Sequence, residues 1–350
     1  YEVNEIDKIE LLDTSSKDGH RIYIRGILYI MAKALNEVYP EALLSVNYQL
    51  SSAMFCKIDN MEITDEMIAR IKARMQEIIN QNLEIRKVVM TKEEAEEFYS
   101  NEKTLRGIVQ IDNTQKEGVS LYYCEDYFNY FFGVMPVTTA YTDVFDVIKY
   151  GDGFLVRYPS AEKPNELTNY KSNKKLLSTL EEYEDIHRVL QIDTLYKLNK
   201  EIKEGRTSNV ILLSEALHEK KMANIADDIA KRKNVKMVLI AGPSSSGKTT
   251  FAKRLGVELR LNGLKPVTIS VDNYFVERVD NPKDENGDYD FECLEAIDLE
   301  LFNNHIKTLL DGGTIDVPTF DFKVGTKRYN GEKMHLEDDE ILVIEGIHCL

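Results

Sequence analysis

The chain has 350 residues, of which 43% are hydrophobic and 30% are charged, a balance typical of a globular protein with two or three domains. Its net charge of −16 argues against a broad, non-specific nucleic-acid surface, because such a surface needs a net basic patch. The apolar runs are all of strand length, so the sequence predicts no membrane-spanning helix.

Residues 1–158 are predicted to form one α+β domain. Apolar residues recur with helical spacing from Ile24 to Val38, and Pro40 follows as a stop signal. The segments SVNYQL and AMFCKID alternate like the two strands of a hairpin. Thr64 is predicted to cap a long amphipathic helix, and TKEE at 91–94 fits a capping box. Two further segments, VSLYYCEDYFNYFFG and DVFDVIKYGDGFLVRYP, read as strands.

Residues 159–234 are predicted to be a linker and a helical segment. The stretch 159–175 is polar and holds two prolines, as domain boundaries often do. Ser214 is predicted to cap the clearest helix, whose apolar side runs from Leu217 to Ile229. From Val235 onward the pattern becomes strand, glycine loop, helix and strand, which predicts a parallel α/β sheet over 235–350.

The segment GPSSSGKT matches the phosphate-loop pattern G-x-x-x-x-G-K-[ST] at every fixed position. Small residues let backbone N–H groups surround phosphate oxygens, Lys248 adds a positive charge for the β- and γ-phosphates, and the Thr249 hydroxyl can bind Mg²⁺. An apolar strand precedes the loop and a helix follows it, as a nucleotide site requires. The predicted cofactor-binding residues are Gly242, Pro243, Ser244, Ser245, Ser246, Gly247, Lys248, Thr249 and Thr250.

Three acidic residues follow at positions where a ligand could bind. Asp272 ends the next strand, where it could take a proton from a hydroxyl or hold a metal through water, although a turn aspartate is the alternative. Asp290 precedes a helix and could cap it or bind a ligand hydroxyl. Glu345 ends a buried strand, at the place of a Walker-B-type acid.

An aromatic segment accompanies these acids. Phe320 and Phe322 lie beside Lys323, Lys327 and Arg328, an arrangement that suits a planar base. Core packing is the alternative for each phenylalanine.

Five motifs, AGPSSSGKTT, ISVDNYF, YDFECLEAID, PTFDF and VIEGI, occur in this order and resemble the uridine kinase and phosphoribulokinase family of P-loop kinases. The resemblance covers about residues 235–350. It implies that Asp272 is the general base for a nucleoside 5′-hydroxyl and that Lys248 is a second catalytic residue. It also implies that Thr249 and Glu345 hold Mg²⁺ and that Asp290 binds sugar hydroxyls.

The same resemblance covers the substrate side. Phe275 and Phe320 fall where the family often has base-contacting tyrosines, so the resemblance implies no preference for uridine. Tyr274 and Arg328 are further predicted substrate contacts. The family's arginine-bearing lid should follow Glu345, beyond Leu350, and we expect the chain to need it for turnover.

The front domain resembles the second N-terminal domain of threonyl-tRNA synthetase, which edits mischarged tRNA. The resemblance rests on IRGILYIMAKALNEVYPEA, ITDEMIARIKARMQEIINQNLEIRKVVMTKEEAEEFY and KYGDGFLVRYP. That family carries an H-x-x-x-H pair where this chain has Arg25 and Tyr29, and the later Cys and His are absent around FFGVMPVTT. We therefore expect the fold without the editing chemistry; Arg25 and Tyr29 either line a retained pocket or belong to the core.

The leading functional prediction is an ATP- and Mg²⁺-dependent kinase that acts on the 5′-hydroxyl of a uridine- or cytidine-like nucleoside. The alternatives are a tRNA- or RNA-binding protein with a nucleotide-driven switch and a nucleotide-sensing regulator. Nucleic acid and membrane are not favoured as partners, and the sequence predicts no oligomeric state. Four scattered cysteines without CxxC spacing and no opening signal peptide indicate a cytoplasmic protein, and the missing initiator Met indicates further residues ahead of Tyr1.

Overall fold

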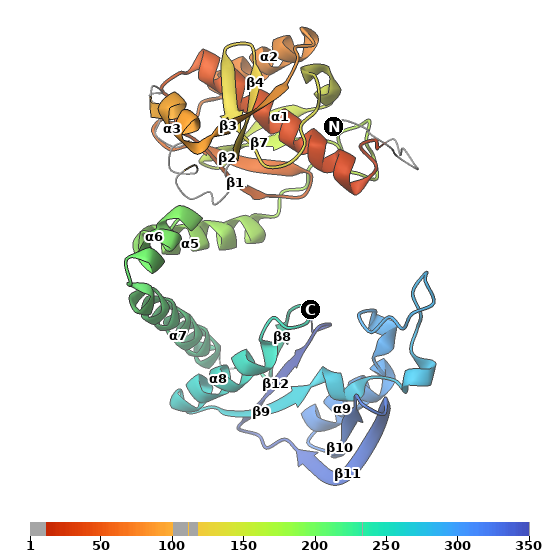
Figure 1. The fold of residues 1–350 in the computed structure, drawn as a ribbon. Coiled ribbons are helices and arrows are strands. Elements are labelled where there is room, and N and C mark those ends of the chain that lie inside the picture. Colours follow the sequence, from red (N-terminus) through yellow and green to blue (C-terminus); the bar gives the residue numbers. More distant parts are fainter. Residues whose placement is uncertain (1–11, 101–110, 112–117, 233, 350) are drawn as a thin grey trace. The chain divides into compact units, whose positions relative to one another are not determined.

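A computed structural model of the chain describes residues 12–100, 111, 118–232 and 234–349. The chain divides into two compact units, Tyr1–Lys200 and Glu201–Leu350, which are described separately (Figure 1). The predicted linker and helical segment at 159–234 is therefore shared between them. Within the described ranges, no helix has the length and apolar character that crossing a membrane requires.

The first unit is built around a four-stranded antiparallel sheet of order β1-β2-β7-β6. Its strands are β1 (Leu44–Gln49), β2 (Ala53–Ile58), β6 (Asp146–Tyr150) and β7 (Gly153–Arg157). Side chains alternate between the two faces of the sheet. One face packs on α1 (Lys17–Val38) and α2 (Asp65–Asn80) in the main core of this unit. The other face packs on residues from α5 (Lys174–Leu190).

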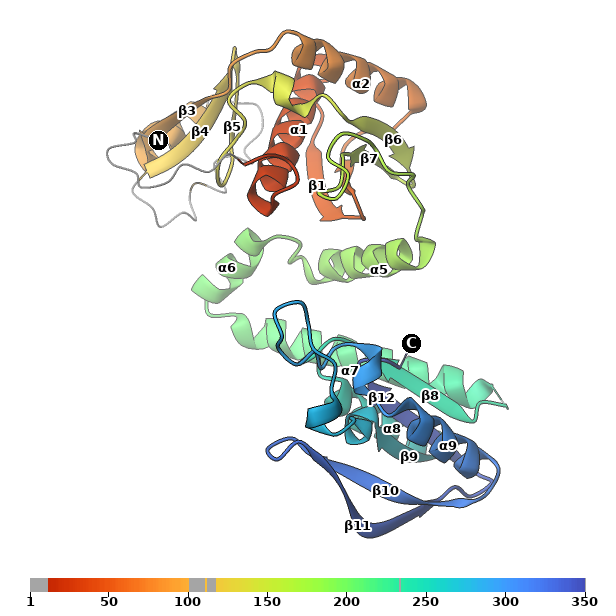
Figure 2. The ribbon, with the colours of Figure 1, turned by 90° about the vertical axis from the view of Figure 1, so that its right-hand side faces the viewer.

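A second antiparallel sheet lies against the other side of α1 (Figure 2). It contains β3 (Arg86–Thr91), β4 (Gly118–Cys124) and β5 (Tyr127–Tyr130) in that order. The helix α3 (Lys92–Ser100) packs on this sheet through Ala95 and Tyr99. A short 3-10 turn, η1 (Thr139–Thr142), precedes β6.

Two predicted helix starts in this unit are confirmed. The Thr64 hydroxyl accepts the backbone N–H of Met67 at 3.2 Å and caps α2. Thr91 and Glu94 form the reciprocal pair of a capping box, with distances of 2.9 Å from Thr91 N to the Glu94 carboxylate and 3.2 Å from Glu94 N to the Thr91 hydroxyl.

The helix α6 (Leu195–Lys203) spans the division between the units, and α7 (Thr207–Lys231) follows in the second. The prediction that Ser214 caps a helix is wrong. Residues 207–213 are already helical, so Ser214 lies inside α7, where its hydroxyl donates to the carbonyl of Val210 at 2.8 Å. The C-terminal half of α7 packs on α8 (Lys248–Leu261) through Ala226 and Ile229.

The second unit contains the predicted parallel sheet, in the order β8-β12-β9. Its strands are β8 (Met237–Ala241), β9 (Lys265–Ser270) and β12 (Glu340–Gly346), and β12 pairs in parallel with both neighbours. Between β9 and β12 the chain forms the turns η2 (Val271–Tyr274), η3 (Arg278–Asp280) and η4 (Leu294–Ala296), the helix α9 (Leu299–Leu310), and a hairpin of β10 (Thr314–Asp321) and β11 (Thr326–His335).

Candidate nucleotide-binding site

The loop between β8 and α8 has the curled backbone that a phosphate cradle needs. Ser245 and Gly247 have positive φ angles of 59° and 84°, in the left-handed region. A Cβ added at Gly242 would lie 2.7 Å from the Ser246 hydroxyl, so a larger residue there would force that hydroxyl to move. Gly247 precedes the first residue of α8 and provides no side-chain cap, which leaves the N–H groups of the first turn available to an anion.

Lys248 lies folded back over this loop. Its Nζ donates to the carbonyl oxygen of Pro243 at 3.0 Å, and the backbone N–H of Ser246 donates to the same oxygen at 3.2 Å. Because a phosphate oxygen carries more negative charge than a carbonyl, it would compete successfully for the ammonium group. The predicted side chains of Ser244, Ser245, Ser246 and Thr250 are exposed around the loop.

Glu345 lies at the centre of the site because β12 lies between β8 and β9. Its register partners are Ile240 in β8 and Ser270 in β9. The side chain is 2% exposed, and one oxygen, Oε1, accepts the Thr249 hydroxyl at 3.1 Å. The other oxygen, Oε2, is buried and has no hydrogen-bond partner among the described residues.

This donor set fits Mg²⁺. A buried carboxylate oxygen without a partner is costly, and a hard cation or its bound water would satisfy it. Among the described residues, no group of three or more His, Cys, Asp and Glu side chains could hold a metal by itself. Mg²⁺ usually takes one or two protein ligands and completes its shell with phosphates and water.

Asp272 lies in η2, directly after β9, and is half-buried. Burial and the Glu345 carboxylate raise the pKa of Asp272 above its ordinary value, while Lys248 opposes the shift. No hydrogen bond from another described residue holds this carboxylate. Two acids and one lysine that interact electrostatically are therefore brought together at the carboxyl ends of parallel strands, where ligands of α/β sheets bind.

Four phenylalanines form a connected group of rings around Phe275, which follows Asp272 by three residues in the chain. Phe275 lies 5.6 Å from Phe320, 5.8 Å from Phe322 and 6.2 Å from Phe291, measured between ring centroids. Phe275 and Phe320 are buried, whereas Phe291 and Phe322 are exposed. The group joins three segments that are far apart in the sequence and offers exposed aromatic faces to a planar ligand.

Three other predicted substrate residues already have partners. Tyr274 is buried in the core, with its hydroxyl 3.2 Å from Nδ1 of His305. The Asp290 carboxylate accepts the backbone N–H groups of Glu292 and Cys293 in the turn before η4. The prediction that it caps the following helix is wrong, because Asp298 is the N-cap of α9. Arg328 forms an ion pair with Asp321 at 3.1 Å. Their roles in substrate binding therefore remain predictions.

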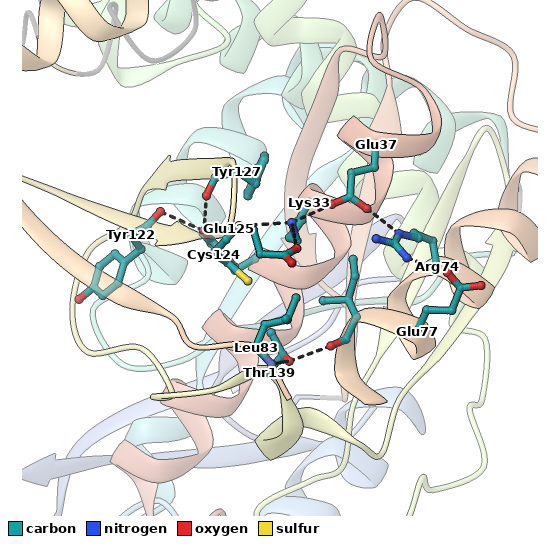
Figure 3. Close-up of polar contacts among 12 residues, drawn as sticks. Lys33, Glu37, Arg74, Glu77, Leu83, Tyr122, Cys124, Glu125, Tyr127 and Thr139 are labelled. Carbon is teal, nitrogen blue, oxygen red and sulfur yellow. Dashed lines mark hydrogen bonds and ion pairs between the residues drawn. The ribbon is translucent and has the colours of Figure 1, made fainter. Parts of the chain in front are cut away.

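In the first unit, a polar network centres on the buried side chain of Lys33 (Figure 3). Lys33 on α1 is 2% exposed, and its ammonium group lies 2.7 Å from Glu37, 3.2 Å from Glu125 and 3.3 Å from the carbonyl of Cys124. Glu37 also pairs with Arg74 on α2. The network ties both helices to the turn between β4 and β5.

The two residues at the positions of the family's histidine pair serve this packing. Tyr29 is fully buried, and its hydroxyl lies 2.9 Å and 3.1 Å from the carbonyl oxygens of Tyr122 and Tyr127. Arg25 donates to the carbonyl of Val134 at 3.1 Å. Tyr29 therefore belongs to the core, and it lines no retained pocket. Sequence reasoning missed Lys33, although the i, i+4 pair Lys33–Glu37 on an apolar helix face was a readable signal.

Comparisons with known proteins agree with both predicted resemblances. Residues 237–350 match the model of the phosphoribulokinase / uridine kinase family. A uridine kinase from Halobacterium salinarum is 31% identical over 111 residues, which is 32% of this chain and 47% of the relative. A threonine–tRNA ligase from Clostridium kluyveri is 24% identical over 124 residues of the N-terminal region, which is 35% of this chain and 20% of the relative.

A solved structure of a possible uridine kinase from Bacillus stearothermophilus has a TM-score of 0.32 and 23% identity, over 36% of this chain and 70% of its own. The chain spans about half the length of the uridine kinases and a fifth of the threonine–tRNA ligase that it matches. The predicted fold class, an α/β P-loop domain preceded by a threonyl-tRNA-synthetase-like α+β domain, is confirmed.

Proposed function

We propose that residues 235–350 bind ATP with Mg²⁺ and transfer its γ-phosphoryl group to the 5′-hydroxyl of a nucleoside. The observation that carries this proposal is the Glu345 carboxylate, which contacts Thr249 of the phosphate loop. Burial and this same carboxylate raise the pKa of Asp272. A nucleotide switch needs the contact between Glu345 and Thr249, but it does not need a second acid, Asp272, at the position of an acceptor. The uridine kinase relatives support the same reading.

The phosphate loop binds and orients ATP. Lys248 exchanges the Pro243 carbonyl for a β- or γ-phosphate oxygen, and the N–H groups at the start of α8 point to the same anion. Thr249 and Glu345 would hold Mg²⁺, which when bound neutralises charge on the phosphates. The buried Oε2 of Glu345 gains a partner in this state, so nucleotide binding relieves a cost that the free protein carries.

Asp272 acts on the acceptor. The nucleoside oxygen forms a bond to the γ-phosphorus, and the bond from that phosphorus to the β,γ-bridging oxygen breaks, so that ADP leaves with the electron pair. The hydroxyl proton passes to the Asp272 carboxylate. A raised pKa makes this carboxylate a better proton acceptor, and its lack of hydrogen bonds leaves it free to orient the hydroxyl.

The ring group of Phe275, Phe291, Phe320 and Phe322 binds the base of the nucleoside by stacking. Base–aromatic stacking tolerates every base, because each has a π-face. We propose a uridine- or cytidine-like acceptor from the relatives and expect weak discrimination among bases. Asp290 is the proposed contact for the sugar hydroxyls, and Arg328 is a further proposed substrate contact.

The test follows ADP release by the full-length protein with ATP, Mg²⁺ and each nucleoside in turn. We expect nucleoside-stimulated release that falls by about 10²- to 10⁴-fold in Asp272→Asn, the range for loss of a general base. Asp280→Asn is the matched control, since Asp280 is exposed at the end of η3 and should retain full activity.

The same assay separates the competing function. The N-terminal similarity to threonine–tRNA ligases motivates an arm in which tRNA replaces the nucleoside. ADP release that only tRNA stimulates, with Asp272→Asn unaffected, would replace the kinase proposal with a tRNA-linked nucleotide switch. We also propose a cytoplasmic location, since Cys56, Cys124, Cys293 and Cys349 are all free thiols.

A further inference from the structure

The second unit carries a groove that the proposed reaction does not use. It lies between α9 and the β10–β11 hairpin and has a volume of about 660 Å³. Its polar lining consists of His305, Thr308, Thr314, Asp316 and Tyr329. A cavity of this size is in the range that holds small molecules, so the question is which chemistry its walls fit.

A β-bulge in the hairpin creates the groove. Asp316 pairs with Lys333 and Pro318 pairs with Tyr329, so one residue of β10 faces three residues of β11 between these pairs. Gly331, in the bulge, has a φ angle of 80°, which glycine adopts without strain. Tyr329 and Gly331, both at this bulge, belong to the lining of the groove, and bulges are common near binding sites.

The α9 side of the groove is fixed in place. The imidazole of His305 is held by the hydroxyl of buried Tyr274 at 3.2 Å, and the two rings are 5.7 Å apart in an edge-to-face arrangement. The Thr308 hydroxyl donates to the carbonyl of Asn304 at 2.8 Å, which leaves its lone pairs free to accept a hydrogen bond from a ligand.

The groove is rich in hydrogen-bond acceptors and holds one carboxylate. Asp316 supplies that carboxylate and forms no ion pair with any other described residue, although Lys333 lies opposite it in the ladder. The lining includes no lysine or arginine; burial and the nearby Lys327 lower the pKa of His305, while Asp316 and Asp298 oppose the shift. Tyr329 is 53% exposed and offers an open ring face. A cation that also donates hydrogen bonds would satisfy these groups.

We propose that this groove binds a small hydroxylated ammonium compound of the amino-sugar type. The ammonium group pairs with Asp316, ring hydroxyls donate to Thr308 and Thr314, and the apolar face of the ring lies on Tyr329. The site is separate from the phosphate loop, so it does not depend on the kinase activity proposed above.

Saturation-transfer NMR with the full-length protein tests the site, with glucosamine and glucose as probes at mildly acidic pH. The two sugars differ at one ring carbon, where glucosamine has an ammonium group and glucose has a hydroxyl. We expect glucosamine to bind about fivefold more tightly, as one exposed ion pair allows. Asp316→Asn should abolish that difference, and Tyr329→Leu should weaken both sugars.

Asp311→Asn is the matched control, because Asp311 is exposed at the end of α9 and outside the lining. Circular dichroism checks that each variant is folded. Equal binding of the two sugars, no saturation transfer to either, or unchanged binding in Asp316→Asn would each overturn the proposal. A preference for glucosamine that Asp316→Asn removes and Asp311→Asn preserves would support it.

Discussion

Replacing Glu345 with methionine should make the ligand-free protein more stable and inactive. The wild-type side chain is 2% exposed, and it has one hydrogen bond, from Thr249 at 3.1 Å, and one oxygen with no partner. Methionine has a similar volume and no polar atom, and the exposed Thr249 hydroxyl can turn to water.

The expected gain follows from the group that is removed. An unsatisfied buried polar group costs about 1–3 kcal/mol, so Glu345→Met should raise the free energy of unfolding by about that amount. Amide hydrogen exchange of β8, β9 and β12 measures this unit separately, and protection should rise by between about fivefold and about a hundredfold. Nucleoside-stimulated ADP release should disappear in the same variant.

A matched change at the start of the same strand controls for the new side chain. Glu340 is partly exposed, and its carboxylate accepts the backbone N–H of Glu337, so Glu340→Met should leave stability unchanged or slightly lower it. Faster exchange in Glu345→Met than in the wild type would refute the reasoning. It would mean that the buried carboxylate already has a stabilising partner in the free protein.

Three further predictions concern the base, the acceptor and the front unit. The pKa of Asp272 is raised above the ordinary aspartate value of 3.8, and a general base must be unprotonated. As pH falls, kcat/KM should therefore begin to drop at a pH above 3.8. A drop that begins only below pH 3.8 would contradict the assignment. Phe322→Ala should raise the acceptor KM about tenfold and leave the ATP KM unchanged, as loss of one stacking face predicts. Val324→Ala is the control, because Val324 is equally exposed on the same hairpin. Equal effects of the two substitutions would show that Phe322 does not belong to the acceptor site. Lys33→Met should destabilise the first unit by about 1–3 kcal/mol in hydrogen exchange of β4 and β5, because the buried carbonyl of Cys124 loses its donor. Lys163→Met, which breaks an exposed pair with Glu166, should have little effect. Similar losses in both variants would argue against a special role for Lys33.

Local chemistry accounts for what the sequence predicted well. Thr64 and the 91–94 capping box act within one helical turn, so their residue types were sufficient. The phosphate loop is a continuous segment between a strand and a helix, and its glycines mark the backbone angles that it needs. The contact between Thr249 and Glu345 was also predictable, because parallel strands end at one edge of the sheet.

Tertiary packing decided what the sequence could not predict. Ser214 has the composition of a cap, yet the preceding residues continue the helix and place it in the interior of α7. Tyr29 was compatible with a pocket or a core, and only the position of β4 and β5 decided between them. Lys33 reads as a surface residue until Glu125, brought in by the β4–β5 turn, joins Glu37 beside it.

The strand order of the parallel sheet has a consequence for biosynthesis. β8 and β9 emerge first from the ribosome, but neither pairs with the other, because both form their backbone hydrogen bonds with β12. The phosphate loop therefore has no finished sheet to support it until α9 and the whole β10–β11 hairpin have been translated. During that interval of several seconds, at about 5–20 residues per second, the apolar edges of β8 and β9 are exposed to chaperones and to aggregation. Slow codons in the hairpin should prolong that exposure, whereas the same codons after β12 should be harmless.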